Sequence, residues 1–306
     1  MSALAEAAAA YLEVRRALGF KLKEHGRLLP SLVSYLDERG IETLTGEAAV
    51  AWACLPTDAG PARWSRRLSV ARGFASYLVS IDPATAMPPT RMWPHRHRPE
   101  PFVCSPVQID ALVDAAGSFG APVTATTYQT VIGLLAVTGM RVGEALGLNH
   151  DDVDLDAGVL TVRGAKFNKS REVPLHPTTV SALAAYTAMR DERFPHREST
   201  SVFASTRGGP LGASRLWIHW QGTVDRVGLA RRDGRRPRLH DLRHSFAVNT
   251  LRTWHERGLD VEARLPLLST YLGHANPAAT YWYLTATPDL LAAAARRLEA
   301  ALGGGS

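Results

Sequence analysis

The sequence is poor in cysteine and lysine and has no long apolar run. Cys54 and Cys104 are its only cysteines, they lie far apart, and neither has metal-ligand spacing, so neither a disulfide framework nor a zinc site is expected. No run of about eighteen apolar residues occurs. The first residues, which include Glu6 and Glu13, lack the basic start and apolar core of a signal peptide. These absences predict a cytoplasmic protein without a membrane span.

Positive charge is carried almost entirely by arginine. Only four lysines stand beside 31 arginines, and part of this bias can come from base composition, since alanine is also abundant. The lysines are therefore the more informative cations. The net charge is +6, but seven arginines and only two acids lie between Arg226 and Arg243. Taken alone, this segment is compatible with two interpretations, a site for a polyanionic partner or a solvated charged loop.

Residues 1–90 carry apolar side chains at helical spacing. Helices are predicted at 11–18, 28–36, 47–53 and 62–80. The first is marked by Tyr11, Val14 and Leu18 on one stripe. In the last, the apolar stripe leaves the arginines on other faces, so that one face packs and another is cationic.

A proline-rich stretch separates this region from the rest of the chain. Six prolines fall between 81 and 102, without periodicity, which predicts a linker at 91–104. Its His95 and His97 have no cysteine or acid at ligand spacing, so no metal is expected. We predict a helical domain at 1–90 and a second domain at 105–302. Residues 303–306 are expected to be a flexible tail or linker remnant.

The second domain is predicted to be mainly helical with a small antiparallel sheet. Helices are expected at 107–116, 125–137, 176–193, 213–227, 240–257, 260–271 and 289–302. Two short β-branched segments, "GVLTVRG" and "REVPL", flank a turn that holds Lys166 and Lys169, which predicts a β-hairpin with cations at its tip. The fold class is therefore α+β.

Several residues could act on a phosphodiester bond. Breaking such a bond requires a nucleophile, cations for the non-bridging oxygens, an acid for the leaving oxygen and an acceptor for the nucleophile's proton. Arg141 and Arg243 are candidates for the cations, because guanidinium groups bind phosphate oxygens bidentately and stay charged. Taken one at a time, these residues can also be explained by a purely structural role. Arg141, for example, could simply pair with Glu144.

Four motifs together resemble the tyrosine recombinase, or phage integrase, family. They are "TGMRVGEALGL", the hairpin "GAKFNKSREVPL", "LHDLRHSFAVNTL" and "YLGHANPAATYWYL". They occur in the family's order between about 105 and 300. The N-terminal helices resemble the family's core-binding, SAM-like domain in helicity and position. The interval between Arg243 and His274 is longer than in compact members of the family.

The resemblance implies a metal-free and cofactor-free strand exchange. Six positions match the family's catalytic set: Arg141, Lys166, His240, Arg243, His274 and Tyr283. The two arginines and a histidine would bind the scissile phosphate, with His274 completing the oxyanion contacts. Lys166 would protonate the 5′ oxygen and His240 would accept or orient the tyrosine proton. Tyr283 would form a 3′-phosphotyrosyl bond, whose retained energy allows rejoining without ATP.

Two positions in this assignment have neighbours of the same kind. Tyr281 is also a phenol, but on a helix it points roughly 200° away from Tyr283, so only one can face the phosphate. Lys169 shares the turn with Lys166 and ranks second as the acid.

The implied partner is double-stranded DNA, with four protomers at synapsis. Candidates for DNA contact are Arg63, Arg66, Arg67, Lys169, Arg235, Arg236 and Arg238. The predicted helix 289–302 would dock on a neighbouring protomer, although the sequence also permits packing in cis. A type IB topoisomerase would use similar chemistry, whereas a DNA-binding regulator of the same fold would have no need of the tyrosine. We expect a recombinase or integrase of a bacterial mobile element.

Overall fold

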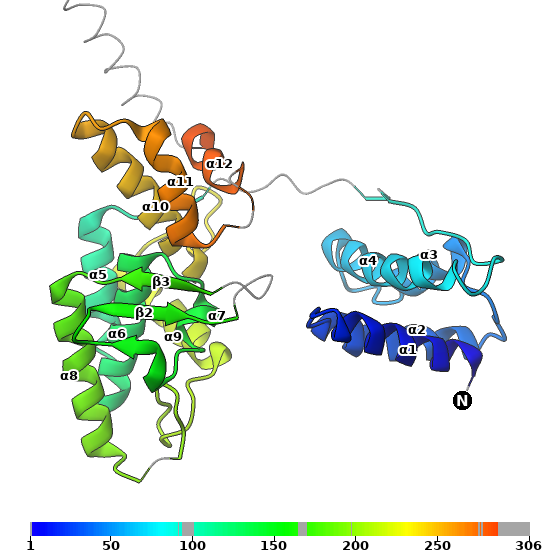
Figure 1. Cartoon of the computed structure of the whole chain (residues 1–306), viewed down its shortest axis with the longest axis horizontal. Coiled ribbons are helices and arrows are strands. Elements are labelled where there is room, and N and C mark those ends of the chain that lie inside the picture. The colour runs from blue at the N-terminus through cyan, green and yellow to red at the C-terminus, as the bar shows by residue number, and fades with distance from the viewer. Residues whose placement is uncertain are drawn as a thin grey trace, which may run out of the picture. The chain divides into compact units, whose positions relative to one another are not determined.

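The computed structural model describes residues 2–90, 92–93, 101–164, 170–196, 198–274, 276 and 278–286. The chain divides into two compact units, 1–99 and 100–306 (Figure 1). Several predictions fall outside the described residues: His95, His97, Lys166, Lys169, the helix at 289–302 and the tail at 303–306. Among the described helices, none combines the length and apolar character that a membrane span needs.

The described part of the N-terminal unit consists of four helices around one core. They are α1 (Ala3–Ala17), α2 (Lys23–Asp37), α3 (Gly46–Cys54) and α4 (Pro61–Leu78). The helices begin where the sequence supplies caps: the Ser2 and Thr45 hydroxyls accept backbone N–H groups of α1 and α3, and Pro61 occupies the first turn of α4. Large side chains such as Leu32 and Trp52 are completely buried between the helices.

The first helix packs through a different face from the predicted one. Val14 and Leu18 are 50% and 67% exposed, whereas Leu4, Ala8 and Tyr11 are buried. Tyr11 belongs to both possible stripes, and the small alanines of the first turns fit closely against the neighbouring helices. Periodicity alone did not distinguish the two faces.

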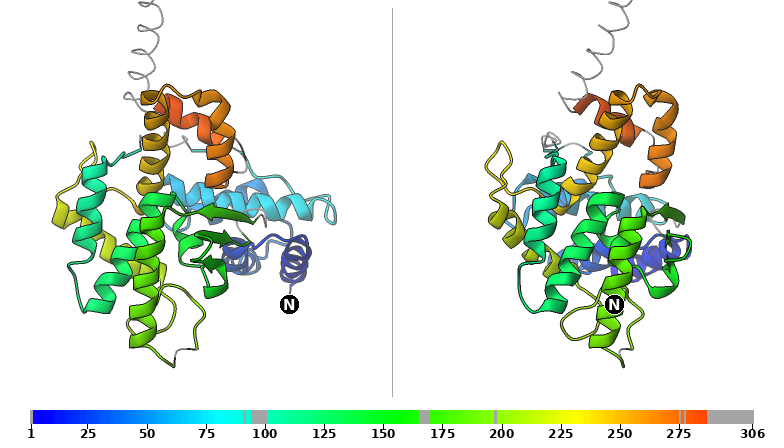
Figure 2. Two further views of the ribbon diagram at one scale, coloured as in Figure 1. Left: turned by 60° about the vertical axis from the view of Figure 1, so that its left-hand side comes forward. Right: turned by 90° about the vertical axis from the view of Figure 1, so that its left-hand side faces the viewer.

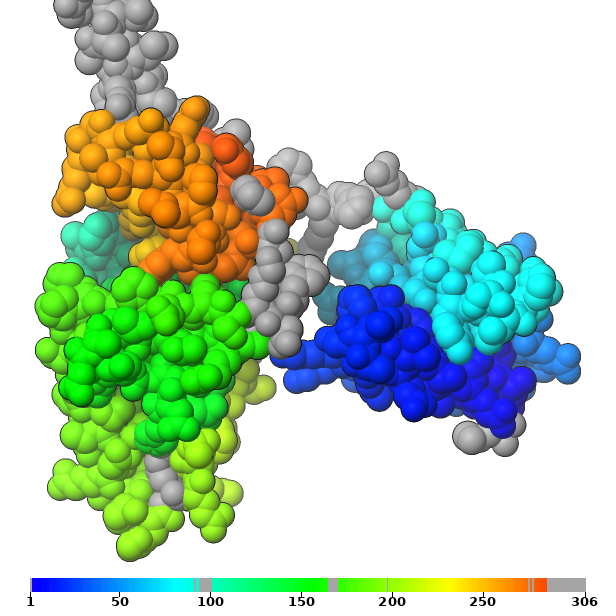
Figure 3. Space-filling model, in the orientation of Figure 1, coloured from blue at the N-terminus to red at the C-terminus, as the bar shows by residue number. Residues whose placement is uncertain are grey.

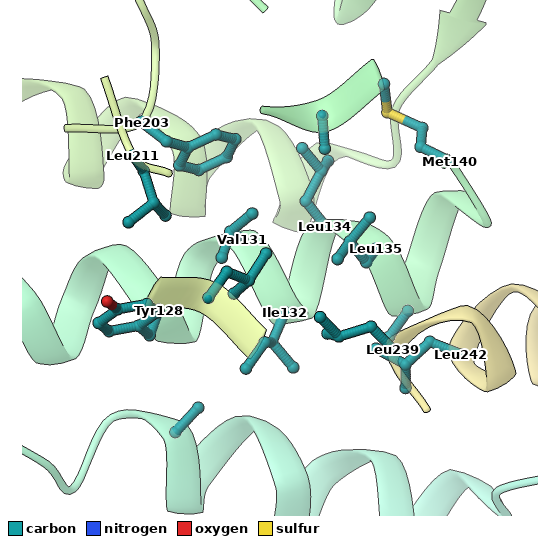
Figure 4. Close-up of a cluster of buried hydrophobic side chains, with 14 of the residues drawn as sticks. Tyr128, Val131, Ile132, Leu134, Leu135, Met140, Phe203, Leu211, Leu239 and Leu242 are labelled. Atoms are coloured by element: carbon teal, nitrogen blue, oxygen red, sulfur yellow. The ribbon is translucent and has the colours of Figure 1, made fainter. Parts of the chain in front are cut away.

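The described part of the C-terminal unit combines helices with a small sheet. Its helices are α5 (Pro106–Ala116), α6 (Pro122–Thr138), α7 (Val142–Ala145), the 3-10 turn η1 (His150–Asp152), α8 (Pro177–Arg193), α9 (Ala213–Val227), α10 (Leu239–Glu256), α11 (Val261–Leu272) and α12 (Ala278–Ala286). Helix α6 lies at the centre and contacts α5, α8 and α10. Figure 4 shows its side chains, including Ile132 and Leu135, next to Leu239 and Leu242 of α10.

The sheet confirms the predicted hairpin. Its strands are β1 (Val153–Asp154), β2 (Val159–Val162) and β3 (Arg171–Pro174), antiparallel in the order β1-β2-β3. In the hairpin, Val159 lies opposite Pro174 and Val162 opposite Arg171. Arg171 therefore stands at the end of the described ladder, immediately after the connection that contains the two lysines.

Helices α10, α11 and α12 form a small lobe at one end of the C-terminal unit. All three contact one another around a cluster that includes Leu251, Leu265, Leu272 and Tyr283. Figure 2 shows this lobe from two further directions. Figure 3 shows the surface of α11 next to that of the strands, in agreement with the contacts between α11 and β3. Helix α12 was not predicted as a separate element, although a helical setting of its tyrosines was considered.

The packing of the N-terminal unit can be tested by truncating one buried and one exposed leucine to alanine. Leu32→Ala should lower the free energy of unfolding by about 2–5 kcal/mol, because a fully buried leucine leaves a cavity. Leu18→Ala should change it by less than about 0.5 kcal/mol, since that side chain is exposed. Both changes in unfolding free energy can be measured by urea denaturation, with circular dichroism as the signal. Equal losses in the two variants would contradict the observed packing.

Candidate active site

The carboxyl end of α11 is the meeting point of three arginines. Three consecutive carbonyl oxygens accept their hydrogen bonds: Tyr271 from Arg171 Nε (2.8 Å), Leu272 from Arg243 Nη2 (2.7 Å) and Gly273 from Arg141 Nη2 (2.9 Å). Carbonyls at a helix end lack intrahelical donors and form the negative pole of the helix dipole. The guanidinium groups satisfy these acceptors and are themselves oriented by them.

Arg243 is anchored from two sides. Its Nη1 also donates to the carbonyl of Gly139 (2.7 Å), and the residue is only 2% exposed. Gly139 ends α6 with a φ of 61°, a conformation that suits glycine. Burial, followed by the positive charge of Arg141, lowers the pKa of Arg243 to about 10. Arg243 therefore remains charged at neutral pH.

Arg141 is held by Glu144 as well as by α11. The Arg141 backbone N–H donates to one carboxylate oxygen of Glu144 (3.0 Å) and its Nη1 to the other (2.7 Å). Arg171 donates to both oxygens, at 2.7 and 3.2 Å. Burial by itself raises the pKa of Glu144, but the hydrogen bonds from Arg171 and Arg141 outweigh it and hold this pKa at about 2. The ion pair considered from the sequence is therefore part of a larger network.

The beginning of α10 is fixed by a buried carboxylate. Asp241 is 0% exposed and accepts the backbone N–H of Arg238 (2.8 Å), Arg238 Nη2 (2.8 Å) and Arg231 Nη1 (2.9 Å). This N-terminal cap sets where the helix begins. It thereby fixes the positions of His240, Arg243 and His244 along the helix.

Tyr283 lies inside the small lobe, in contact with two histidines. It is 2% exposed, and its hydroxyl shares a hydrogen bond with His244 Nδ1 at 3.0 Å. The ring of His274 lies 6.2 Å from the Tyr283 ring, at 22° between the planes. Tyr281, in contrast, is 51% exposed. The two tyrosines thus face in different directions, as expected for a helix.

His274 follows directly after the arginine-bound carbonyls. Its Nδ1 shares a hydrogen bond with Thr280 Oγ1 at 2.7 Å. Burial, followed by the charges of Arg243 and Arg141, lowers its pKa to about 4. His274 is therefore neutral at pH 7 in this arrangement and can act as a neutral hydrogen-bonding group.

His240 is exposed at the edge of the site. Its ring meets the ring of His244 edge to face at 4.7 Å. Desolvation, followed by the charges of Arg243 and Arg238, lowers its pKa. The described contact to the Tyr283 hydroxyl comes from His244, one helical turn further on.

Sequence reasoning did not assign Arg171 or His244 a role. A signal for Arg171 existed: strand residues two apart share a face, and Val173 on the same face is fully buried. A charge on the inward face of a strand requires a partner. His244 directly follows Arg243 in the sequence, but its approach to Tyr283 depends on the packing of α12 against α10.

The cationic candidates differ in their surroundings. Arg63 and Arg66 are exposed on α4. Arg67 is 8% exposed, lies 3.9 Å over the Trp52 ring and donates to the Trp52 carbonyl, so it supports the fold of its unit. Its position does not favour a DNA contact. Lys169 lies outside the described residues.

The arginines of the loop before α10 surround a hollow of about 700 Å³. Arg235, Arg236 and Arg238 line it together with Trp217 of α9, which is 55% exposed. Arg236 pairs with Asp225 on the surface. Among the described residues, no group of three or more His, Cys, Asp or Glu side chains could hold a metal ion.

A buried tyrosine, adjacent histidines and two fixed arginines on this fold define a class of enzymes that break and rejoin DNA through tyrosine. Residues 103–289 match the phage integrase family. A Sinorhizobium fredii (strain NGR234) protein with the provisional name integrase/recombinase y4rB is 41% identical over 307 residues, covering 98% of each chain. The tyrosine recombinase XerD of Mycobacterium tuberculosis is 32% identical over 88% of each chain. The chain belongs to the phage integrase family and is a site-specific tyrosine recombinase that cleaves and rejoins DNA.

Solved structures agree in fold. The XerH recombinase in a post-cleavage complex with difH DNA matches with a TM-score of 0.61 and 20% identity, covering 86% of this chain and 72% of that chain. The Tn1549 transposon integrase with circular intermediate DNA matches with a TM-score of 0.62 and 14% identity, covering 95% and 99%. A λ integrase tetramer on a Holliday junction matches at 0.59 with 20% identity, covering 90% and 78%.

The low pKa of Glu144 predicts an acid-sensitive stabilisation. Because its folded-state pKa of about 2 lies below the ordinary 4.5, the contribution is complete above pH 4.5 and disappears as pH falls toward 2. It amounts to a quantity on the order of 3 kcal/mol. The difference in unfolding free energy between wild type and Glu144→Gln should therefore shrink over this range in urea titrations.

A control for this titration is Glu256→Gln. Glu256 is 62% exposed and pairs with Arg252 at 3.7 Å, so its removal should matter by less than about 0.5 kcal/mol. A pH-independent difference between wild type and Glu144→Gln would contradict the ionised network.

Proposed function

We propose that Tyr283 is the nucleophile of strand cleavage and forms a 3′-phosphotyrosyl bond. The observation that carries this proposal is the convergence at the end of α11: the arginine-bound carbonyls lead directly into His274, whose ring lies beside Tyr283. The Tyr283 oxygen would attack the phosphorus and the 5′ oxygen would leave. The reverse attack by a 5′ hydroxyl would rejoin the strands and release the tyrosine.

Arg141 and Arg243 would hold the non-bridging oxygens of the scissile phosphate. A guanidinium group has five N–H donors, and the bonds described above engage two on each arginine. The side chain of Arg141 is 31% exposed, so its remaining donors can reach a phosphate. Arg243, which is 2% exposed, would add its charge from below the surface. Groups fixed before the reaction stabilise developing charge without reorganisation. His274, neutral and beside them, would complete the oxyanion contacts.

Proton transfer would involve histidine at the nucleophile and lysine at the leaving group. In the tautomer with hydrogen on Nε2, His244 Nδ1 accepts the hydrogen of the Tyr283 hydroxyl, which makes it a candidate acceptor. His240, exposed beside His244, remains the acceptor implied by the family resemblance. Lys166 would protonate the 5′ oxygen, with Lys169 second, as the resemblance implies.

The expected partner is double-stranded DNA, bound by both units. Arg63 and Arg66 present charge on α4, and Arg235, Arg236 and Arg238 surround the hollow beside Trp217. Exposed pairs such as Arg236–Asp225 contribute little stability, so they can exchange for phosphate contacts. Such contacts supply affinity that falls with salt.

Assembly and biological setting are proposed from the relatives. XerH and λ integrase structures contain DNA, and one λ integrase assembly is a tetramer on a Holliday junction. We propose four protomers at synapsis, linked by the segment 289–302 of each chain. The similarity to y4rB, provisionally named an integrase/recombinase, extends along nearly the whole chain. We propose that this recombinase serves a bacterial mobile element and acts on DNA in the cytoplasm.

Trapping on nicked suicide DNA tests the nucleophile. In EDTA, wild type and Tyr281→Phe should form a protein–DNA adduct that survives denaturation, whereas Tyr283→Phe should form none. Salt-sensitive DNA binding by all three provides the control for folding. An adduct with Tyr283→Phe, or none with wild type on the element's own end, would contradict the assignment.

The two histidines of α10 can be compared by the same assay. His244→Asn should slow adduct formation at saturating DNA by about 10²-fold, because a group on the tyrosine proton is lost. His240→Asn is the matched exchange one turn away. A loss confined to His240→Asn would contradict the role given to His244.

A further inference from the structure

Arg171 is built tightly into the site. It opens β3, its side chain is 10% exposed, and all three of its guanidinium nitrogens are engaged. Nη2 and Nη1 donate to the two oxygens of Glu144, and Nε donates to the Tyr271 carbonyl. One side chain thus joins the sheet, the α7 segment and the carboxyl end of α11.

The space before His274 is occupied by this guanidinium group. Gly273 has a φ of +67°, and a Cβ atom added there would lie 2.7 Å from Arg171 Nη1 and 2.9 Å from Cζ. Glycine is therefore required twice, by the backbone conformation and by the approach of Arg171. The same close approach limits how the segment leading into His274 can move.

Glu144 transmits the position of Arg171 to Arg141. Each carboxylate oxygen accepts one bond from Arg171 and one from Arg141. Bidentate pairs of this kind fix orientation as well as charge. Because Glu144 is only 9% exposed, loss of Arg171 would leave a largely buried carboxylate to rearrange around its remaining partner.

We propose that Arg171 is a positioning residue for the phosphate clamp, that is, for Arg141 and Arg243. It sets the pose of Arg141 through Glu144. By binding the Tyr271 carbonyl it also holds the chain end whose next two carbonyls, of Leu272 and Gly273, orient Arg243 and Arg141. It stands at the first residue of β3, opposite Val162 of β2, and so ties the sheet to the end of α11. The inference rests on the proposed function of Arg141 and Lys166.

The test uses two altered scissile phosphates. A methylphosphonate carries no negative charge and reduces the need for clamp arginines, whereas a 5′-thio leaving group needs no proton from an acid. On ordinary nicked DNA, Arg171→Gln should form adduct about 10²-fold more slowly, the scale of a small misplacement of reacting groups. It should recover on methylphosphonate, as we also expect of Arg141→Ala. It should not recover on 5′-thio DNA, on which we expect Lys166→Ala to recover.

Arg163→Gln provides the matched control. Arg163 lies just after β2, at the other side of the same connection, is 64% exposed and pairs with Asp152 rather than Glu144. It should cleave all three substrates like wild type. Arg171→Lys retains the charge with a single nitrogen and should fall between wild type and Arg171→Gln. Thermal unfolding shows whether each variant is folded.

The outcomes separate the proposals. If Arg171→Gln does not fold, Gly273→Ala replaces it in the test. This variant keeps the charges of Arg171 and Glu144, but its added Cβ displaces the Arg171 guanidinium group. It should show the same recovery on methylphosphonate. Wild-type rates in a folded Arg171→Gln, recovery on 5′-thio DNA alone, or recovery on neither substrate would overturn the positioning role. Failure of wild type to form adduct, or of Arg141→Ala and Lys166→Ala to show their own recoveries, would instead count against the proposed function.

Discussion

The hydrogen bonds from three arginines to the last carbonyls of α11 are the constraint on which the rest of the site depends. A helix end carries acceptors that its own backbone cannot satisfy, together with a partial negative charge. Here these acceptors are bound by Arg171 of the sheet, Arg243 of α10 and Arg141 at the beginning of α7. The helix end thereby collects cations that would otherwise repel one another.

The negative charge of Glu144 offsets part of the repulsion between these arginines. Its carboxylate lies between Arg141 and Arg171 and stays ionised because both donate to it. Burial, followed by the positive charge of Arg141, lowers the pKa of Arg243 to about 10, yet this group remains charged at neutral pH. A site with fixed cations next to a buried tyrosine is suited to hold a phosphate, since the charge that would stabilise it is already in place.

Much of the fold could be predicted from local pattern. The hairpin followed from two short β-branched runs, and helices such as α9 and α10 were predicted within one residue of their observed ends. The failure at Val14 and Leu18 has a simple cause: α1 offers two apolar stripes, and the choice between them depends on what packs against it. Arg67 shows the same limit, because a cation near an aromatic ring can belong to the core.

The sequence by itself determined the chemical groups and their order: arginine boxes, a lysine-bearing hairpin, a histidine and a tyrosine at the family's spacing. Local spacing also separated Tyr283 from Tyr281, because helical periodicity is a property of adjacent residues. Only the tertiary structure decided that His244 meets the Tyr283 hydroxyl and that Arg171 joins Glu144 to α11. These contacts link residues 27 to 100 positions apart, and they arise from the packing of whole elements, which no local pattern encodes.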